Sequence, residues 1–199
     1  MTELKKYKMF IDGEWEDSES KKTFKTLNPE NNEPWAEVPE ASEKDIDKAV
    51  KAAQKAFEGK WPKLFPRERA KYLKAIAEQL RENAELLGKI ETIDTGKLFK
   101  ETKTQANYIA EYYDYYAGLA DKVEGTVLPI DKANMQVITT RVPIGVIAAI
   151  IPWNSQMLLT AVKLAPALAM GNTVVIKSSE LAPATLFEFA KLIEKIGIP

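Results

Sequence analysis

The stretch Val142–Ala182, VPIGVIAAIIPWNSQMLLTAVKLAPALAMGNTVVIKSSELA, decides the fold. Its first apolar run, Ile144–Ile151, stops at a Pro-Trp-Asn sequence. Apolar residues at helical spacing follow, end at Gly171–Asn172, and give way to a second apolar run, Thr173–Ile176. A strand, a crossover helix and a second strand form the unit that builds buried parallel sheets. The sequence therefore predicts an α/β fold.

Chemically suggestive residues follow both predicted strands. The first strand is followed by Pro152–Trp153–Asn154, and the second by Lys177–Ser178–Ser179–Glu180. Ligands of open parallel sheets bind beyond the carboxyl ends of the strands. We therefore expect the functional site at these two neighbouring strand ends.

The composition excludes several kinds of chemistry. The 199 residues contain no cysteine and no histidine, so a disulfide, an imidazole base and the common zinc sites are all excluded within them. The net charge of −1 gives no basis for binding nucleic acid. No apolar run is long enough to cross a bilayer. The N-terminus, MTELKKYKMFIDG, lacks a signal-peptide pattern, so a cytoplasmic location is expected.

The residues before the deciding stretch suggest strands followed by helices. Residues 1–41 are typical of short strands, with a turn at Asp12–Gly13. Ser42 and Asp45 form a capping-box pattern at the start of a helix whose apolar stripe includes Ile46 and Val50. Further helices are predicted from Pro66, after Asn83 and over about 100–120. The tyrosines of the last helix are interpreted as packing groups.

Residues 124–143 have the pattern of a β-hairpin that is exposed unless another surface covers it. An exposed hairpin can pair with another chain. An oligomer contact and a plain surface hairpin both fit the pattern. The predicted division is therefore 1–123 for the N-terminal strands and helices, 124–143 for the hairpin, and 144–199 for the first part of the parallel sheet.

Several motifs in order resemble the aldehyde dehydrogenase superfamily. These are IDGEW, LNPEN, IDTGK, YYAG, EGTVLPI, RVPIGV and the PWN that lies nine residues before a lysine. The resemblance implies the N-terminal part of a Rossmann-type cofactor domain, with a protruding hairpin through which the protein forms a dimer or tetramer. It also implies an NAD(P)-dependent enzyme that oxidises an aldehyde to a carboxylic acid. The cysteine nucleophile and the glutamate of that mechanism cannot be assigned in this chain, so these 199 residues are expected to be inactive alone.

The resemblance assigns roles only at matching positions. Asn154 matches the asparagine that stabilises the oxyanion, and Lys163 matches a lysine assigned to proton relay in part of the family. The positions that match the cofactor site are Ile150, Ile151, Pro152, Trp153, Asn154, Lys177, Ser178, Ser179 and Glu180. A carboxylate at position 180 would repel a ribose 2′-phosphate, so NAD is expected rather than NADP.

Three further positions, Thr26, Leu27 and Asp94, match a monovalent-cation site of some members. A carboxylate with backbone oxygens suits a hard cation. A capping or turn role for Asp94 explains the same residue equally well.

The chain departs from the family pattern at Ser155, Gln156 and Ser178, where an aromatic residue, a proline and a second proline are usual. These departures leave the substrate open. Two other functions compete with the dehydrogenase. One is a truncated, non-catalytic homologue that associates with a full-length aldehyde dehydrogenase. The other is a serine–lysine hydrolase, for which no spacing in the sequence provides support.

Overall fold

The structure of the protein is a computed structural model that describes residues 4–199. Its centre is the parallel pair β8 (Val146–Ile150) and β9 (Thr173–Lys177), connected by α5 (Gln156–Ala169). The register runs from Val146↔Thr173 to Ile150↔Lys177. The predicted strand–helix–strand unit is therefore confirmed.

Asn172 fixes the connection between α5 and the two strands. Gly171 takes a positive φ of 84°, which ends the helix in a conformation that glycine tolerates best. The Asn172 side-chain oxygen accepts hydrogen bonds from the backbone amides of Ile144, at 2.7 Å, and Gly145, at 3.1 Å. The entrance to β8 is thereby tied to the turn before β9.

Four more helices pack with α5 around the main core. They are α2 (Pro66–Glu82), α3 (Ala84–Thr95), α4 (Phe99–Leu119) and α6 (Ala184–Ile196). The predicted helix start at Pro66 and the break at Asn83 are both confirmed. Fully buried side chains of the core include Leu73, Ile76, Leu80, Ile109, Tyr113 and Phe189. The short 3₁₀ turn η1 (Trp61–Lys63) adds Trp61, whose indole N–H donates to the Asn172 carbonyl at 2.9 Å.

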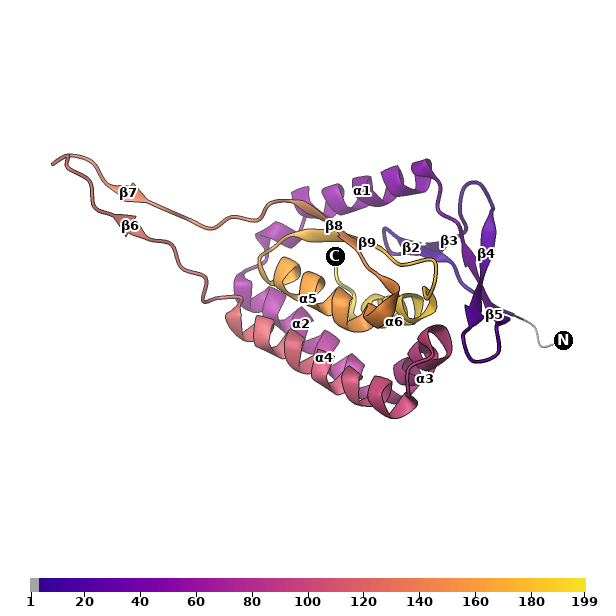
Figure 1. The fold of residues 1–199 in the computed structure, drawn as a ribbon. Coiled ribbons are helices and arrows are strands. Elements are labelled where there is room, and N and C mark those ends of the chain that lie inside the picture. Colours follow the sequence, from indigo (N-terminus) through magenta and orange to yellow (C-terminus); the bar gives the residue numbers. More distant parts are fainter. Residues whose placement is uncertain (1–3) are drawn as a thin grey trace.

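Helix α1 (Glu43–Glu58) lies on the other side of the β8–β9 pair from α5, α2 and α4 (Figure 1). The capping box of Ser42 and Asp45 is present as predicted. The apolar stripe of α1 is only partly covered, because Ile46 is 53% exposed and Val50 is 43% exposed. A pair of strands offers only a narrow surface, so it covers one edge of the stripe and leaves the rest in solvent.

The N-terminal strands form two small sheets. One consists of β1 (Lys5–Lys6), β5 (Glu33–Pro39) and β4 (Thr23–Asn28) in that order, and the other pairs β2 (Met9–Ile11) with β3 (Glu14–Glu16). The predicted turn at Asp12–Gly13 is confirmed by positive φ angles of 52° and 83°. The larger sheet packs through Ala36 and Val38 into a second core cluster that includes Ile90 and Ala184.

The predicted hairpin extends far from the rest of the molecule (Figure 1). Its paired parts are β6 (Val127–Leu128) and β7 (Val137–Ile138), which are antiparallel. Val127, Leu128, Met135 and Ile138 are between 46% and 64% exposed. None of the helices described over residues 4–199 combines the length and the apolar character needed to cross a membrane.

Candidate functional site

The two strand ends meet as the sequence predicts. The Ile151 amide donates to the Lys177 carbonyl at 2.9 Å, which continues the register of the parallel pair by one residue. Ile151 is buried, whereas Ile150 is 70% exposed and Trp153 is 50% exposed. The two exposed apolar side chains therefore remain available to a ligand at the edge of the sheet.

Asn154 lies in the 3₁₀ turn η2 (Trp153–Ser155), which joins the end of β8 to the first residue of α5. Pro152 precedes the turn in an extended conformation, with φ −75° and ψ 168°. The Asn154 side chain is exposed, and among residues 4–199 it has no hydrogen-bond partner. Its amide N–H groups are therefore free to donate to a ligand.

Lys177 and Glu180 pair beyond the end of β9, with their Nζ and Oε2 atoms 2.9 Å apart. Both side chains are more than half exposed. A hydrogen bond from the Glu180 backbone amide and the contact with Lys177 hold the pKa of the Glu180 carboxyl below its ordinary value, so this group is charged at neutral pH. Ser179 is buried, and its Oγ accepts from the Leu181 amide at 3.2 Å. This contact stabilises the turn that carries the pair.

Lys163 is half-buried on α5 and donates from Nζ to the Leu159 carbonyl of the same helix at 3.3 Å. This is the one contact that the structure gives its ammonium group within residues 4–199. The structure does not bring Lys163 into contact with Asn154 or Lys177, and its assignment to proton relay stays a prediction.

Asp94 connects three elements. Its Oδ1 accepts from the Thr26 hydroxyl of β4 at 3.0 Å, and its Oδ2 accepts from the Ala184 amide at the start of α6 at 2.7 Å. Burial raises the pKa of Asp94 to about 6, although the hydrogen bonds from Ala184 and Thr26 oppose that effect. Asp94 therefore has the capping role that the sequence left open. Leu27 is 41% exposed, and the monovalent-cation role of Thr26, Leu27 and Asp94 stays a prediction.

Sequence reasoning missed a polar cluster beside Asn154, formed by Glu91, Lys97, Gln105 and Ser155. Lys97 Nζ lies 3.2 Å from Glu91 Oε1 and donates to Ser155 Oγ at 2.5 Å. Gln105 Nε2 donates to the same oxygen at 3.3 Å. The available signals were Ser155, as a departure from the family pattern, and Gly96, whose positive φ of 75° ends α3 just before Lys97. No sequence signal indicated Gln105.

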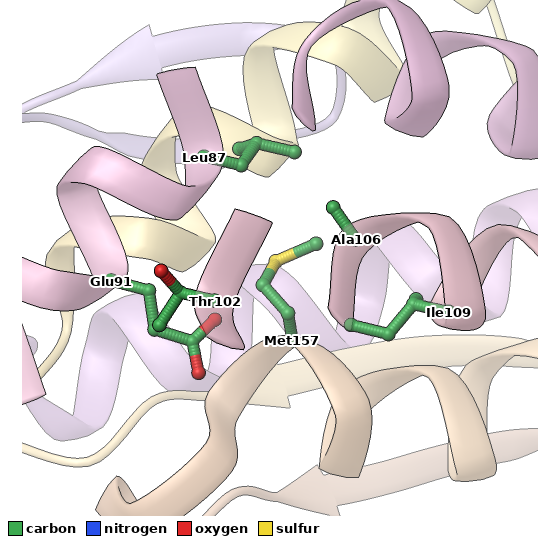
Figure 2. A pocket seen from close by; sticks show the side chains of 6 residues that line it. All are labelled: Leu87, Glu91, Thr102, Ala106, Ile109 and Met157. Carbon is green, nitrogen blue, oxygen red and sulfur yellow. The ribbon is translucent and has the colours of Figure 1, made fainter. Parts of the chain in front are cut away.

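The Glu91 carboxylate lies in a closed part of this region. Figure 2 shows Met157 of α5 between Glu91 and Thr102 on one side and Ala106 and Ile109 on the other. The gap that these side chains line has no room for a water molecule. Burial accordingly raises the pKa of Glu91, while the ion pair with Lys97 opposes this rise. The ion pair is largely buried, because the side chain of Glu91 is 3% exposed and that of Lys97 is 26% exposed.

Solved structures share this fold. Betaine aldehyde dehydrogenase from Staphylococcus aureus in complex with NAD⁺ is 37% identical and superimposes with a TM-score of 0.92 over 96% of this chain and 38% of that one. The apo form of a G234S mutant of the same enzyme superimposes with a TM-score of 0.93 over 100% of this chain. The α/β architecture is therefore that of the N-terminal part of an aldehyde dehydrogenase cofactor domain.

Curated relatives match at higher identity. One is (Z)-2-((N-methylformamido)methylene)-5-hydroxybutyrolactone dehydrogenase from Acinetobacter baylyi, 48% identical over 98% of this chain. Another is betaine aldehyde dehydrogenase from Bacillus subtilis, 43% identical over 96%. The chain spans about 40% of the length of these two relatives. The model of the aldehyde dehydrogenase family matches residues 15–199, which include every residue of the site described above. The chain belongs to the aldehyde dehydrogenase family.

Proposed function

We propose that this chain is the N-terminal, cofactor-binding part of an enzyme that oxidises an aldehyde to a carboxylic acid with NAD as the hydride acceptor. The observation that carries the proposal is the free amide of Asn154 in the turn after β8, whose partner strand β9 leads into the Lys177–Glu180 pair. The family membership supports the reaction type, and the NAD⁺ held by the S. aureus relative supports the cofactor.

The exposed groups at the strand ends fit a dinucleotide. Lys177 can donate to, and Glu180 can accept from, the two adjacent hydroxyls of a ribose. The charged Glu180 carboxylate would repel a 2′-phosphate, which favours NAD over NADP. The segment from Ile150 to Trp153 offers exposed apolar surface along the same edge, with Ser178 and Ser179 in the turn that supports the pair. When bound, NAD would accept the hydride that leaves the substrate.

Asn154 is assigned to the oxygen of the aldehyde. A neutral amide donates hydrogen bonds without adding a titratable group, and a donor held in place before reaction stabilises an oxyanion most effectively. Lys163 is half-buried and lies nine residues further along the polypeptide, and it is assigned to proton transfer on the family resemblance alone. The proposed enzyme takes its nucleophilic cysteine from outside these 199 residues, since they contain no cysteine. The resemblance assigns the glutamate that activates water to no position among them.

The self-association partner is a second copy of the same protein, bound through the 124–143 hairpin. The exposed apolar side chains of β6 and β7 support this assignment, because an open pair of strands with apolar groups is a surface suited to strand pairing. The names of the two curated relatives indicate different substrates, a hydroxybutyrolactone derivative and betaine aldehyde, so they leave the aldehyde open.

The absence of cysteine also favours a second function, a non-catalytic homologue that associates with a full-length aldehyde dehydrogenase. Reading the gene past the codon for Pro199 separates the two. The experiment that tests the enzyme is NADH formation by the full-length gene product with a panel of aldehydes. Turnover with at least one aldehyde supports the dehydrogenase, and inactivity with all of them in a product that binds a full-length homologue supports the second function.

A further inference from the structure

The Ser155 hydroxyl has a hydrogen-bond donor that the chain does not use. Its oxygen accepts from Lys97 Nζ at 2.5 Å and from Gln105 Nε2 at 3.3 Å. An ammonium and a side-chain amide N–H can only donate, so the hydroxyl hydrogen takes no part in either contact. Within residues 4–199 the structure gives this hydrogen no acceptor. Ser155 therefore presents a donor directly after Asn154.

Lys97 holds this hydroxyl and strengthens it as a donor. The Lys97 ammonium is anchored by Glu91, whose side chain is 3% exposed, with 3.2 Å between Nζ and Oε1. A hydroxyl that accepts from a cation donates more strongly, because hydrogen bonds in a chain polarise one another. Lys97 thus acts through Ser155 and is a positioning residue.

An open groove lies on the surface of α4, and one of its lining residues contacts this hydroxyl. It has a volume of about 540 Å³ and is lined by Leu98, Lys100, Glu101, Thr104, Gln105 and Tyr108. Gln105 both lines the groove and contacts Ser155. The next residue along the chain, Gln156, is fully buried, and among the described residues neither atom of its amide has a hydrogen-bond partner. The two residues that directly follow Asn154 therefore both carry polar groups that the described residues leave unused.

We infer that Ser155 selects aldehydes that carry an oxygen acceptor, such as a hydroxyl, an ether or a carbonyl, on the carbon next to the aldehyde group. The inference rests on the proposed function, because Asn154 has to hold the aldehyde oxygen for the neighbouring residue to reach the adjacent carbon. A hydrogen bond from Ser155 then stabilises the substituent, and an alkyl group at the same place leaves that donor unpaired.

The test compares two aldehydes of equal size in the full-length gene product. Methoxyacetaldehyde and butanal differ only by an ether oxygen in place of a methylene group. The measured quantity is the ratio of kcat/KM for methoxyacetaldehyde to kcat/KM for butanal. Ser155→Ala removes one oxygen and should lower this ratio by about 2- to 10-fold. Ser20→Ala, the same substitution at an exposed residue between β3 and β4, should leave the ratio unchanged.

Lys97→Met should lower the same ratio, and adding Ser155→Ala to it should lower the ratio no further, because both substitutions act on one hydrogen bond. The ratio is measured within one protein, so a loss of stability that affects both substrates equally does not change it. An unchanged ratio in Ser155→Ala, or an equal loss for the two aldehydes, overturns the inference. A wild-type protein that oxidises neither aldehyde nor any other overturns the proposed function itself, which is a distinguishable result.

Discussion

Asp94→Asn should change how stability depends on pH. Asp94 is 1% exposed, and burial raises its pKa from an ordinary 3.8 to about 6. Between these two values the folded protein binds more protons than the unfolded chain, so the stability that this group contributes is present at low pH and is lost as the pH rises through about 6. Asparagine keeps an oxygen acceptor at this position but does not titrate.

The size of the effect follows from the two pKa values. From these pKa values, the free energy of unfolding of the wild-type protein should fall by about 1.4 kcal/mol between about pH 5 and about pH 7.5. In Asp94→Asn the residue at this position does not titrate, so it contributes no such fall. For a domain of this size the loss corresponds to about 3 to 6 °C in the thermal midpoint. The midpoint of Asp94→Asn minus that of the wild type should therefore rise by this amount over the same pH range.

Thermal unfolding of the full-length gene product at the two pH values measures this difference. Asp45→Asn is the matched control, because Asp45 is also buried: burial alone would raise its pKa, but hydrogen bonds from Ser42, Ser18 and the Glu19 amide hold it at about 2. Its midpoint difference from wild type should be constant over this range. A difference for Asp94→Asn that is also constant, or that falls as the pH rises, refutes the reasoning.

Further predictions concern the cation, the cofactor, the isolated chain and the hairpin. If Thr26, Leu27 and Asp94 bind a monovalent cation, the thermal midpoint of the wild type should be higher in a potassium salt than in a tetramethylammonium salt of equal ionic strength. Asp94→Asn should abolish this difference, and equal wild-type midpoints in the two salts count against the site. Glu180→Gln should weaken NAD binding and narrow the preference for NAD over NADP, and an unchanged ratio of kcat/KM for the two cofactors contradicts its assignment. Purified residues 1–199 should form no NADH with any aldehyde. They should also elute from a size-exclusion column as associated species, because the sheet has open edges, and a sharp monomer peak would contradict this association. Ile138→Asp, on the exposed hairpin, should lower the oligomeric state of the full-length product, and an unchanged assembly removes the hairpin from the interface.

The features predicted correctly depend on short stretches of sequence. Strand, helix and strand around Asn154 follow from apolar periodicity and from the breaks at Pro152 and Gly171, which act on the backbone locally. The adjacency of the end of β8 and Lys177 follows from the general geometry of parallel pairs. The capping box at Ser42 likewise involves residues three positions apart.

The features that were missed depend on contacts between distant elements. The period of α1 identifies an apolar stripe, but it cannot show that two strands leave Ile46 and Val50 exposed. The contact of Lys97 with Ser155 joins residues 58 positions apart, and that of Asp94 with Ala184 joins residues 90 apart. Only the packing of α3 and α4 against the start of α5 and of α6 creates these contacts.

The most direct test of the proposed function is kcat for Asn154→Ala in the full-length gene product, measured together with NAD affinity by fluorescence titration. Loss of one positioned oxyanion donor should lower kcat by about 10²–10³-fold, while NAD affinity should barely change because the amide serves the substrate oxygen. Asn107→Ala, at an exposed asparagine of α4, is the matched control and should retain full activity. A near-normal kcat in Asn154→Ala, or a loss of NAD binding in proportion to the loss of activity, would contradict the oxyanion role and leave Asn154 as a residue of the turn.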